Sequence, residues 1–184
     1  DLIGRIPTHA EIKQYQKWPM AKRRAKLVDK LLADSRYADR WTVFFSDLLR
    51  IRSNATGGNS LLAYTHKAIE SNRPWDELAR EIISANGTTG KVPAVGFILG
   101  EDAEPMALAA ATGQMLLGVR IQCAQCHNHP FDSWKQMDFY QMAAFTNGIK
   151  TSKDHLAEYL EDKEDMDGVS RELRDVSRLV RYAV

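Results

Sequence analysis

Apolar residues recur along most of this chain at the spacing of an α-helix. The clearest pattern follows Ser35, where large apolar side chains occupy positions i, i+4, i+7, i+8 and i+11: Tyr37, Trp41, Phe44, Phe45 and Leu48. This spacing puts the side chains on one face of a helix. We predict an amphipathic helix that Ser35 caps and whose aromatic face packs in the core.

Similar patterns predict further helices before and after this one. Thr8 and Glu11 have the spacing of a capping box, which marks the start of a short helix. Pro19 suits the first turn of the next helix, and Ser60 is expected to open another. With the helix after Ser35, the expected helices span about residues 8–18, 19–32, 35–49, 60–71 and 75–83.

Residues 87–103 are rich in Gly and Pro and lack helical periodicity. The apolar run from Val95 to Leu99 is predicted to lie as an extended segment across the core.

Between about residues 104 and 148, two apolar helices are expected to meet at a corner. The first runs from Glu104 into residues 123–127 and is interrupted by few charges. Pro130 limits its continuation, and Asp132 or Ser133 is expected to cap the second helix, which ends at Asn147-Gly148. The sequence therefore predicts a compact all-α domain over 1–148, with a charged helical extension or the start of a following region over 149–184.

The corner carries the chain's most specific chemistry, in the segment Cys123-Ala-Gln-Cys126-His127. This C-x-x-C-H pattern is the attachment signature of a c-type haem. Cys123 and Cys126 would form thioethers with the haem, and His127 would bind the iron as the proximal ligand. In an α-helix these three side chains would share one face.

Two alternatives stay open at this segment. Zinc could be held by Cys123, Cys126 and either His127 or His129, although no second pair of ligands is present to close a structural zinc site. A redox-active cysteine pair is the third interpretation, but it is typical of a βαβ context, whereas the surroundings here are predicted to be helical.

Neighbouring residues have secondary roles in this hypothesis. Phe131 and Trp134 are expected to shield the haem, and His129 to form a hydrogen bond near it or to serve as an alternative metal ligand. Met137 or Met142 is the candidate for the distal iron ligand. An open distal position would instead suit a haem enzyme.

Composition narrows the class of protein without changing this picture. The formal net charge of +1 gives no reason to expect nucleic-acid binding, and no apolar run is long enough for a membrane span. The only two cysteines lie three residues apart, which excludes a framework of structural disulfides. The first residue is not Met, so we expect a piece of a longer protein.

Several segments together resemble a known family. They are Leu2-x-Gly4-Arg5-x-Pro7-Thr8, Leu27-Val28-Asp29, Arg40-Trp41, and the run from Gln114 to Asp132 that contains Gly118-Val119-Arg120 and His129-Pro130-Phe131. This series is similar to the planctomycete cytochrome-like domain family of the PSCyt type, a family of unknown function. The resemblance covers about residues 1–147 and is most specific over 114–145.

The resemblance implies an extracytoplasmic, multidomain setting and favours haem, but it implies no reaction. The resulting hypothesis is a domain with covalent haem c that passes electrons to other domains or subunits of a larger redox assembly. A zinc-stapled or metal-free structural module is the alternative of a different class. No Ser-His-Asp set or nucleotide-binding loop competes with either.

Overall fold

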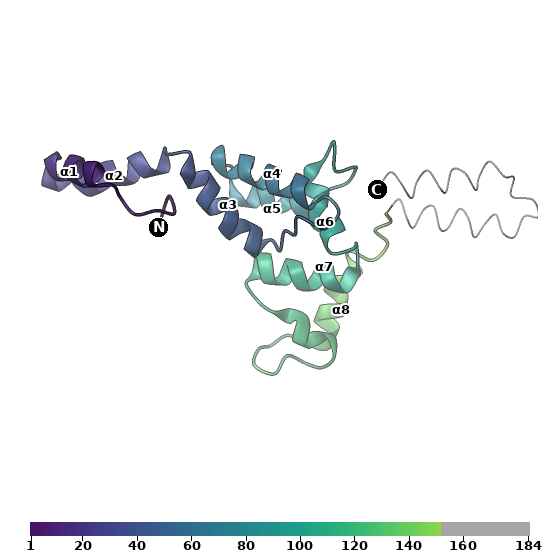
Figure 1. Ribbon diagram of the computed structural model, residues 1–184. Helices are drawn as coiled ribbons and strands as arrows, with labels where there is room; N and C mark the ends of the chain where they lie inside the picture. The colour runs from purple at the N-terminus through teal and green to yellow at the C-terminus, as the bar shows by residue number, and fades with distance from the viewer. Residues whose placement is uncertain (152–184) are drawn as a thin grey trace, which may run out of the picture. The chain divides into compact units, whose positions relative to one another are not determined.

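The computed structural model describes residues 1–151, and every regular element in that range is a helix (Figure 1). This confirms the all-α prediction for the described part of the chain. The chain divides into two units, Asp1–Asn147 and Gly148–Val184, and the predicted helices of the charged extension lie outside the described residues. The α-helices are α1 (His9–Lys17), α2 (Arg23–Leu32), α3 (Arg36–Leu48), α4 (Gly58–Glu70), α5 (Trp75–Ile83), α6 (Gly96–Gly100), α7 (Pro105–Thr112) and α8 (Gln136–Ala144). Shorter helical turns are η1 (Met20–Lys22), η2 (Pro93–Val95), η3 (Gly113–Leu117) and η4 (Ile121–Gln125).

The predicted capping box opens α1. Thr8 Oγ1 accepts a hydrogen bond from the Glu11 N–H at 3.3 Å, and Glu11 Oε2 accepts one from the Thr8 N–H at 2.8 Å. Arg5 also donates to both carboxylate oxygens of Glu11, at 2.7 and 2.9 Å. These bonds, first from Arg5 and then from Thr8, hold the pKa of Glu11 well below its usual range.

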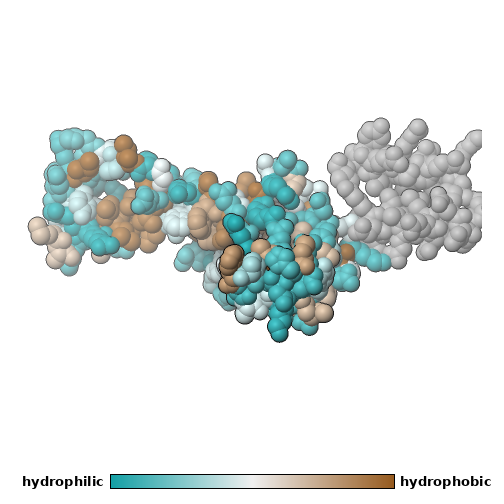
Figure 2. Space-filling model, turned by 90° about the horizontal axis from the view of Figure 1, so that it is seen from below, coloured by the Kyte–Doolittle hydropathy of each residue, from teal (hydrophilic) through white to brown (hydrophobic). Residues whose placement is uncertain are grey.

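Basic residues at the start of α2 contact the C-terminal end of α1. Arg23 donates to the main-chain oxygens of Gln16 and Trp18, at 2.9 and 3.1 Å, and Lys26 lies 4.8 Å from the centre of the Trp18 ring. Arg23 thus satisfies carbonyl groups that a helix leaves unpaired at its C-terminus, and Lys26 makes a cation–π contact with the ring. This part also contains an apolar cavity of about 290 Å³ between residues 1–7, α1 and α2, and hydrophobic surface gathers over it in Figure 2.

The aromatic residues of α3 do not form the most deeply buried face of that helix. That face is made by Ala38 and Thr42, which are small enough to let α3 and α4 approach closely, and Thr42 Oγ1 donates to the Ala38 carbonyl at 2.7 Å. The predicted aromatic stripe is half-buried to exposed instead. Its rings contact one another in a row that ends on Trp75 of α5, whose ring centre is 5.2 Å from that of Phe45.

The segment from Val95 to Leu99 is helical, so its prediction as an extended segment was wrong. The segment forms the end of η2 and most of α6, with Val95, Phe97 and Ile98 buried. An extended segment would need a neighbouring strand for its main-chain groups, and helical turns satisfy those groups internally.

Glycines allow α4 and α6 to touch through their backbones. A Cβ atom on Gly96 would lie 2.4 Å from the Gly57 carbonyl oxygen. Gly57 itself has φ of +76°, in the left-handed region, and α4 begins directly after it at Gly58 rather than at Ser60. The loop before α4 is therefore a packing element as well as a connector.

The long helix predicted from Glu104 into the cysteine segment is interrupted before it reaches the cysteines. Glu104 caps α7 by accepting from the N–H groups of Met106 and Ala107, and α7 is buried on most sides, as predicted. After α7 the helix continues as the wider π-helical turn η3 and ends at Gly118, where φ is +67°. A residue in this left-handed conformation ends a helix, so the cysteines lie on a separate element.

Candidate functional site

Gly113 and Gly118 together determine how the chain reaches the cysteines. The turn at Gly118 sends the chain back toward η3, and Ile121 packs against Gly113. A Cβ atom on Gly113 would lie 2.9 Å from Ile121 Cδ1, so a larger residue would displace this contact. The 3₁₀ turn η4 begins at Ile121 and carries the first part of the C-x-x-C-H segment.

The segment has a buried side, the inner edge, and a solvent-exposed side, the outer edge. Side chains three residues apart eclipse each other in a 3₁₀ helix. Ile121 and Ala124 are 1% and 0% exposed, whereas Cys123 and Cys126, also three residues apart, are both exposed and both free thiols. Cys123 lies within η4 and Cys126 directly follows it, so the two cysteines are not on the α-helix that the sequence predicted.

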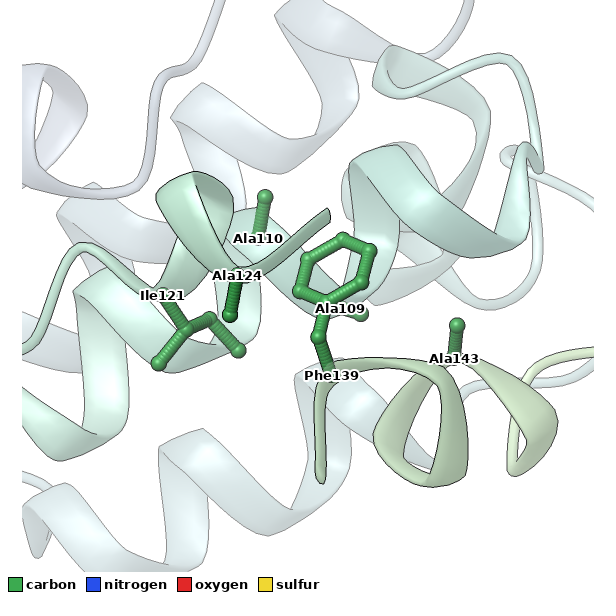
Figure 3. Packing of buried hydrophobic residues seen from close by; sticks show 6 residues of the cluster. All are labelled: Ala109, Ala110, Ile121, Ala124, Phe139 and Ala143. Atoms are coloured by element: carbon green, nitrogen blue, oxygen red, sulfur yellow. The ribbon is translucent and has the colours of Figure 1, made fainter. Parts of the chain in front are cut away.

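The inner edge anchors the segment to α7 and α8. Figure 3 shows Ile121 and Ala124 beside Ala109 and Ala110 of α7 and Phe139 of α8. Burial of apolar side chains is the main source of stability for such a junction. Partly buried hydrophobic residues complete the cluster: Met106, Val119, Trp134 and Met142.

Hydrogen bonds to α8 hold the chain on both sides of Cys126 and His127. On one side the Gln125 carbonyl accepts from Tyr140 Oη at 3.1 Å and from Gln136 Nε2 at 3.2 Å. On the other side Asn128 Oδ1 accepts from the N–H of Gln136 at 3.0 Å. Cys126 and His127 thus lie between two residues, Gln125 and Asn128, that are both hydrogen-bonded to α8.

The imidazole of His127 is oriented by a main-chain oxygen. Its Nδ1 lies 2.7 Å from the carbonyl oxygen of Asn128. A carbonyl only accepts, so Nδ1 must carry the hydrogen, and in the neutral ring Nε2 then has a free lone pair. This is the arrangement in which a histidine binds a metal through Nε2.

His129 presents the opposite arrangement. Its Nδ1 accepts from the N–H of Phe131 at 3.3 Å, so Nε2 carries the hydrogen in the neutral ring. The N–H of His129 also donates to the Trp134 carbonyl at 2.8 Å, which closes the loop between the segment and α8. The His129 side chain is therefore tied into the loop through Nδ1, the ring nitrogen that His127 directs at the Asn128 carbonyl.

The second helix of the corner begins at Gln136, so the prediction that Asp132 or Ser133 caps it was wrong. Asp132 Oδ1 accepts from the Ser133 N–H at 2.7 Å, within the loop. Within the helix start, Asp138 Oδ2 accepts from the Lys135 N–H at 2.8 Å, whereas the N–H of Gln136 is capped by Asn128, eight residues earlier. A distant residue supplies the cap, and local spacing does not reveal it.

The other residues assigned to the site lie at different depths. Phe131 is 94% exposed and Met137 is 64% exposed. Trp134 and Met142 are partly buried and packed against the cluster described above. Phe131 and Met137 are therefore the two with side chains free to contact a bound group.

The alternative zinc site lacks a converging set of ligands. Over residues 1–151, no three His, Cys, Asp or Glu side chains are gathered closely enough to hold a metal ion. A structural zinc site needs four ligands, whereas a haem iron needs only one imidazole from this segment. The sequence pattern did not predict the three residues whose side chains link the segment to α8, which are Asn128, Gln136 and Tyr140. The i, i+4 spacing of Gln136 and Tyr140 does place them on the same face of α8.

The comparison with protein families decides the identity of the domain. The model of the family described as PSCyt2, protein of unknown function (DUF1549), matches residues 1–151. The chain belongs to the PSCyt2 family. No curated protein and no solved structure is significantly similar to it. Membership of PSCyt2 thus brings no activity with it, and function has to be argued from the site. Within residues 1–151, no helix has the length and apolar character needed to cross a membrane.

Proposed function

We propose that this PSCyt2 domain carries one covalent haem c and transfers electrons within a larger exported protein or complex. Cys123 and Cys126 would be the thioether anchors and His127 the proximal iron ligand. The proposal concerns the described part of the chain, because all three residues lie within it.

The orientation of His127 is the observation that carries the proposal. The Asn128 carbonyl accepts a hydrogen bond from Nδ1 at 2.7 Å, which leaves the lone pair of Nε2 free to bind a metal. The same hydrogen bond raises the basicity of the imidazole, which strengthens it as an iron ligand.

The thiols support the same conclusion. Both are exposed and unpaired; Cys123 lies in η4, Cys126 directly follows it, and His127 is next in the chain. Covalent attachment needs two accessible thiols on one side of the macrocycle, and the inner edge of η4 keeps them there by burying Ile121 and Ala124. The donor set therefore fits a haem.

When bound, haem supplies a one-electron redox centre whose potential depends on axial ligands, hydrogen bonds and burial. The chain's own contribution would be to hold the iron through His127 and to cover part of the haem with apolar side chains. Phe131 is available for this cover because its ring is almost fully exposed. Trp134, packed against the cluster, would form the fixed wall behind it.

The distal iron ligand is proposed from the exposure of the two candidate methionines. Met142 is packed against the apolar cluster, so recruiting it would remove core contacts. Met137 is exposed on α8 and is the better candidate. A Met ligand raises the potential and suits electron transfer, whereas an open position would suit a haem enzyme.

The test is maturation of the full chain in a host with cytochrome c maturation machinery. A pyridine haemochrome spectrum after denaturation should report one covalent haem per chain, and intact mass should increase by one haem. The control is the same chain produced without that machinery, which should carry none. A chain that remains free of covalent haem under maturing conditions would refute the proposal.

The same preparation separates the alternatives. Metal analysis that finds stoichiometric zinc and no haem would favour the structural module. If haem is present, carbon monoxide binding to the reduced native protein would indicate an open distal position, and its absence would favour a side-chain ligand.

A further inference from the structure

Asn128 connects α8 to the imidazole of His127 through two different atoms. Its main-chain oxygen accepts from His127 Nδ1 at 2.7 Å, and its side-chain Oδ1 accepts from the N–H of Gln136 at 3.0 Å. Gln136 is the first residue of α8. One residue therefore carries both the hydrogen bond that orients the imidazole and the hydrogen bond that begins the helix.

We propose that the Asn128 side chain is a positioning device for His127: by capping α8 it holds its own carbonyl against Nδ1 and so decides which ring nitrogen is free to bind. This inference rests on the proposed function for its consequence, namely iron ligation, but its physical content concerns the protein without haem.

The residues next to this helix end offer no substitute for the cap. The residue before Gln136 is Lys135, whose side chain has no acceptor atom. The carboxylate of Asp138 is engaged by the N–H of Lys135 at 2.8 Å. Without Oδ1 of residue 128, the N–H of Gln136 would lose its partner, and the Asn128 main chain would lose its direct link to α8.

The neighbouring contacts explain why the effect should be local. Gln125, on the other side of Cys126, is held to α8 by Tyr140 and by the Gln136 side chain. Ile121 and Ala124 remain anchored in the cluster. The His129 N–H also stays on the Trp134 carbonyl at 2.8 Å. Loss of the Asn128 cap would therefore free only the stretch between Gln125 and His129, which contains His127, while η4 stays in place.

The direct test is the tautomer of His127 in the full chain without haem. Nitrogen-15 NMR would be recorded at about pH 8.5, where an ordinary imidazole is neutral. The parent chain should show His127 with hydrogen on Nδ1, and Asn128→Ala should shift it to a mixture containing the Nε2–H form. His129 is the internal reference: its Nδ1 accepts from the Phe131 N–H, a contact that does not involve the Asn128 side chain, so its Nε2–H form should persist in both proteins.

Two further variants separate the cap from general damage. Asn128→Asp keeps an acceptor at the start of α8, where a negative charge is also favourable, and should restore the Nδ1–H form. Gln136→Ala removes the bond to the Gln125 carbonyl but keeps the N–H that Asn128 caps, so His127 should keep its tautomer. An unchanged His127 tautomer in Asn128→Ala, with helix content retained by circular dichroism, would overturn the inference.

The haem-loaded chain gives a second readout. An imidazole that no longer donates from Nδ1 is a weaker electron donor to iron, so Asn128→Ala should raise the midpoint potential relative to the parent chain. If the parent chain attaches no haem at all, the proposed function fails, yet the tautomer comparison still decides the role of Asn128.

Discussion

His127 and His129 use the same ring nitrogen in opposite ways. Nδ1 of His127 donates to the Asn128 carbonyl at 2.7 Å, whereas Nδ1 of His129 accepts from the Phe131 N–H at 3.3 Å. Two histidines separated by one residue are thereby given different chemical roles. Of the two, only His127 has a free lone pair on Nε2 in its neutral form.

This difference predicts unequal effects of matched substitutions. In chains matured with haem, His127→Ala should remove the axial histidine and change the absorption spectrum of the native protein, with a large loss of haem per chain. His129→Ala should retain the spectrum and most of the haem. Absorption spectra and haem content measure both, and equal losses in the two variants would contradict the assignment.

The cysteines predict a graded result. Cys123→Ala or Cys126→Ala should each leave a single thioether, seen as a shifted haemochrome band, and the double variant should hold no covalent haem. Both side chains are exposed, so each substitution should change the free energy of unfolding by less than about 0.5 kcal/mol. Urea denaturation of the haem-free variants checks that the loss of haem is not a loss of fold.

Phe139 should be the main energetic link between the cysteine segment and α8. It is 1% exposed in the cluster with Ile121 and Ala124, so Phe139→Ala should lower the free energy of unfolding by about 3–5 kcal/mol. Phe131→Ala is the matched control, because Phe131 is 94% exposed, and its effect should stay within about 0.5 kcal/mol. Denaturation of both haem-free chains decides; similar losses would mean that the cluster does not stabilise this junction.

The close contact at the start of α4 and α6 predicts different stabilities for two matched glycine substitutions. Gly96→Ala would place a Cβ atom 2.4 Å from the Gly57 carbonyl oxygen, and overpacking of this kind should cost about 1–3 kcal/mol. A Cβ atom on Gly100, at the other end of α6, would meet nothing within 4 Å. Gly100→Ala should therefore be neutral or stabilising by up to about 1 kcal/mol. Thermal unfolding of the two variants would refute this explanation if the order were reversed.

Tyr64 predicts a pH dependence at the alkaline end. Burial, followed by its hydrogen bond to the Glu81 carboxylate, raises the pKa of Tyr64 to about 12. Because the folded-state pKa lies above the ordinary value of about 10, the protonated phenol is favoured in the folded protein. The associated stability is fully present below about pH 10 and is lost as the pH rises through about 12.

A difference titration of phenolate absorbance between the parent chain and Tyr64→Phe isolates this group. Its midpoint should lie near pH 12 and should fall in Glu81→Gln, because the neutral amide no longer opposes a nearby phenolate charge. A midpoint near the ordinary value of about 10 in the parent chain would show that the contact with Glu81 is not maintained.

The sequence itself determined the helical class and most helix positions in the described region. The capping box of Thr8 and Glu11 and the span of α5 follow from local spacing, because a helix satisfies its main-chain groups within itself. The order of Cys123, Cys126 and His127 likewise identified the candidate chemistry. These features depend on residues a few positions apart, and for that reason they can be read directly.

Tertiary structure decided what depends on residues far apart in the chain. The apolar run at Val95 became helical because it packs on α4 and has no strand within residues 1–151 to pair with. Small residues, rather than the aromatic ones, make the buried face of α3 because close approach to α4 excludes large rings. Gly118 ended the predicted helix, so that Ile121 could return to Gly113 and the cysteines came to lie in and directly after a separate 3₁₀ turn. The cap from Asn128 to Gln136 arises from the folding back of α8, since a hydrogen bond depends on where both partners lie in space.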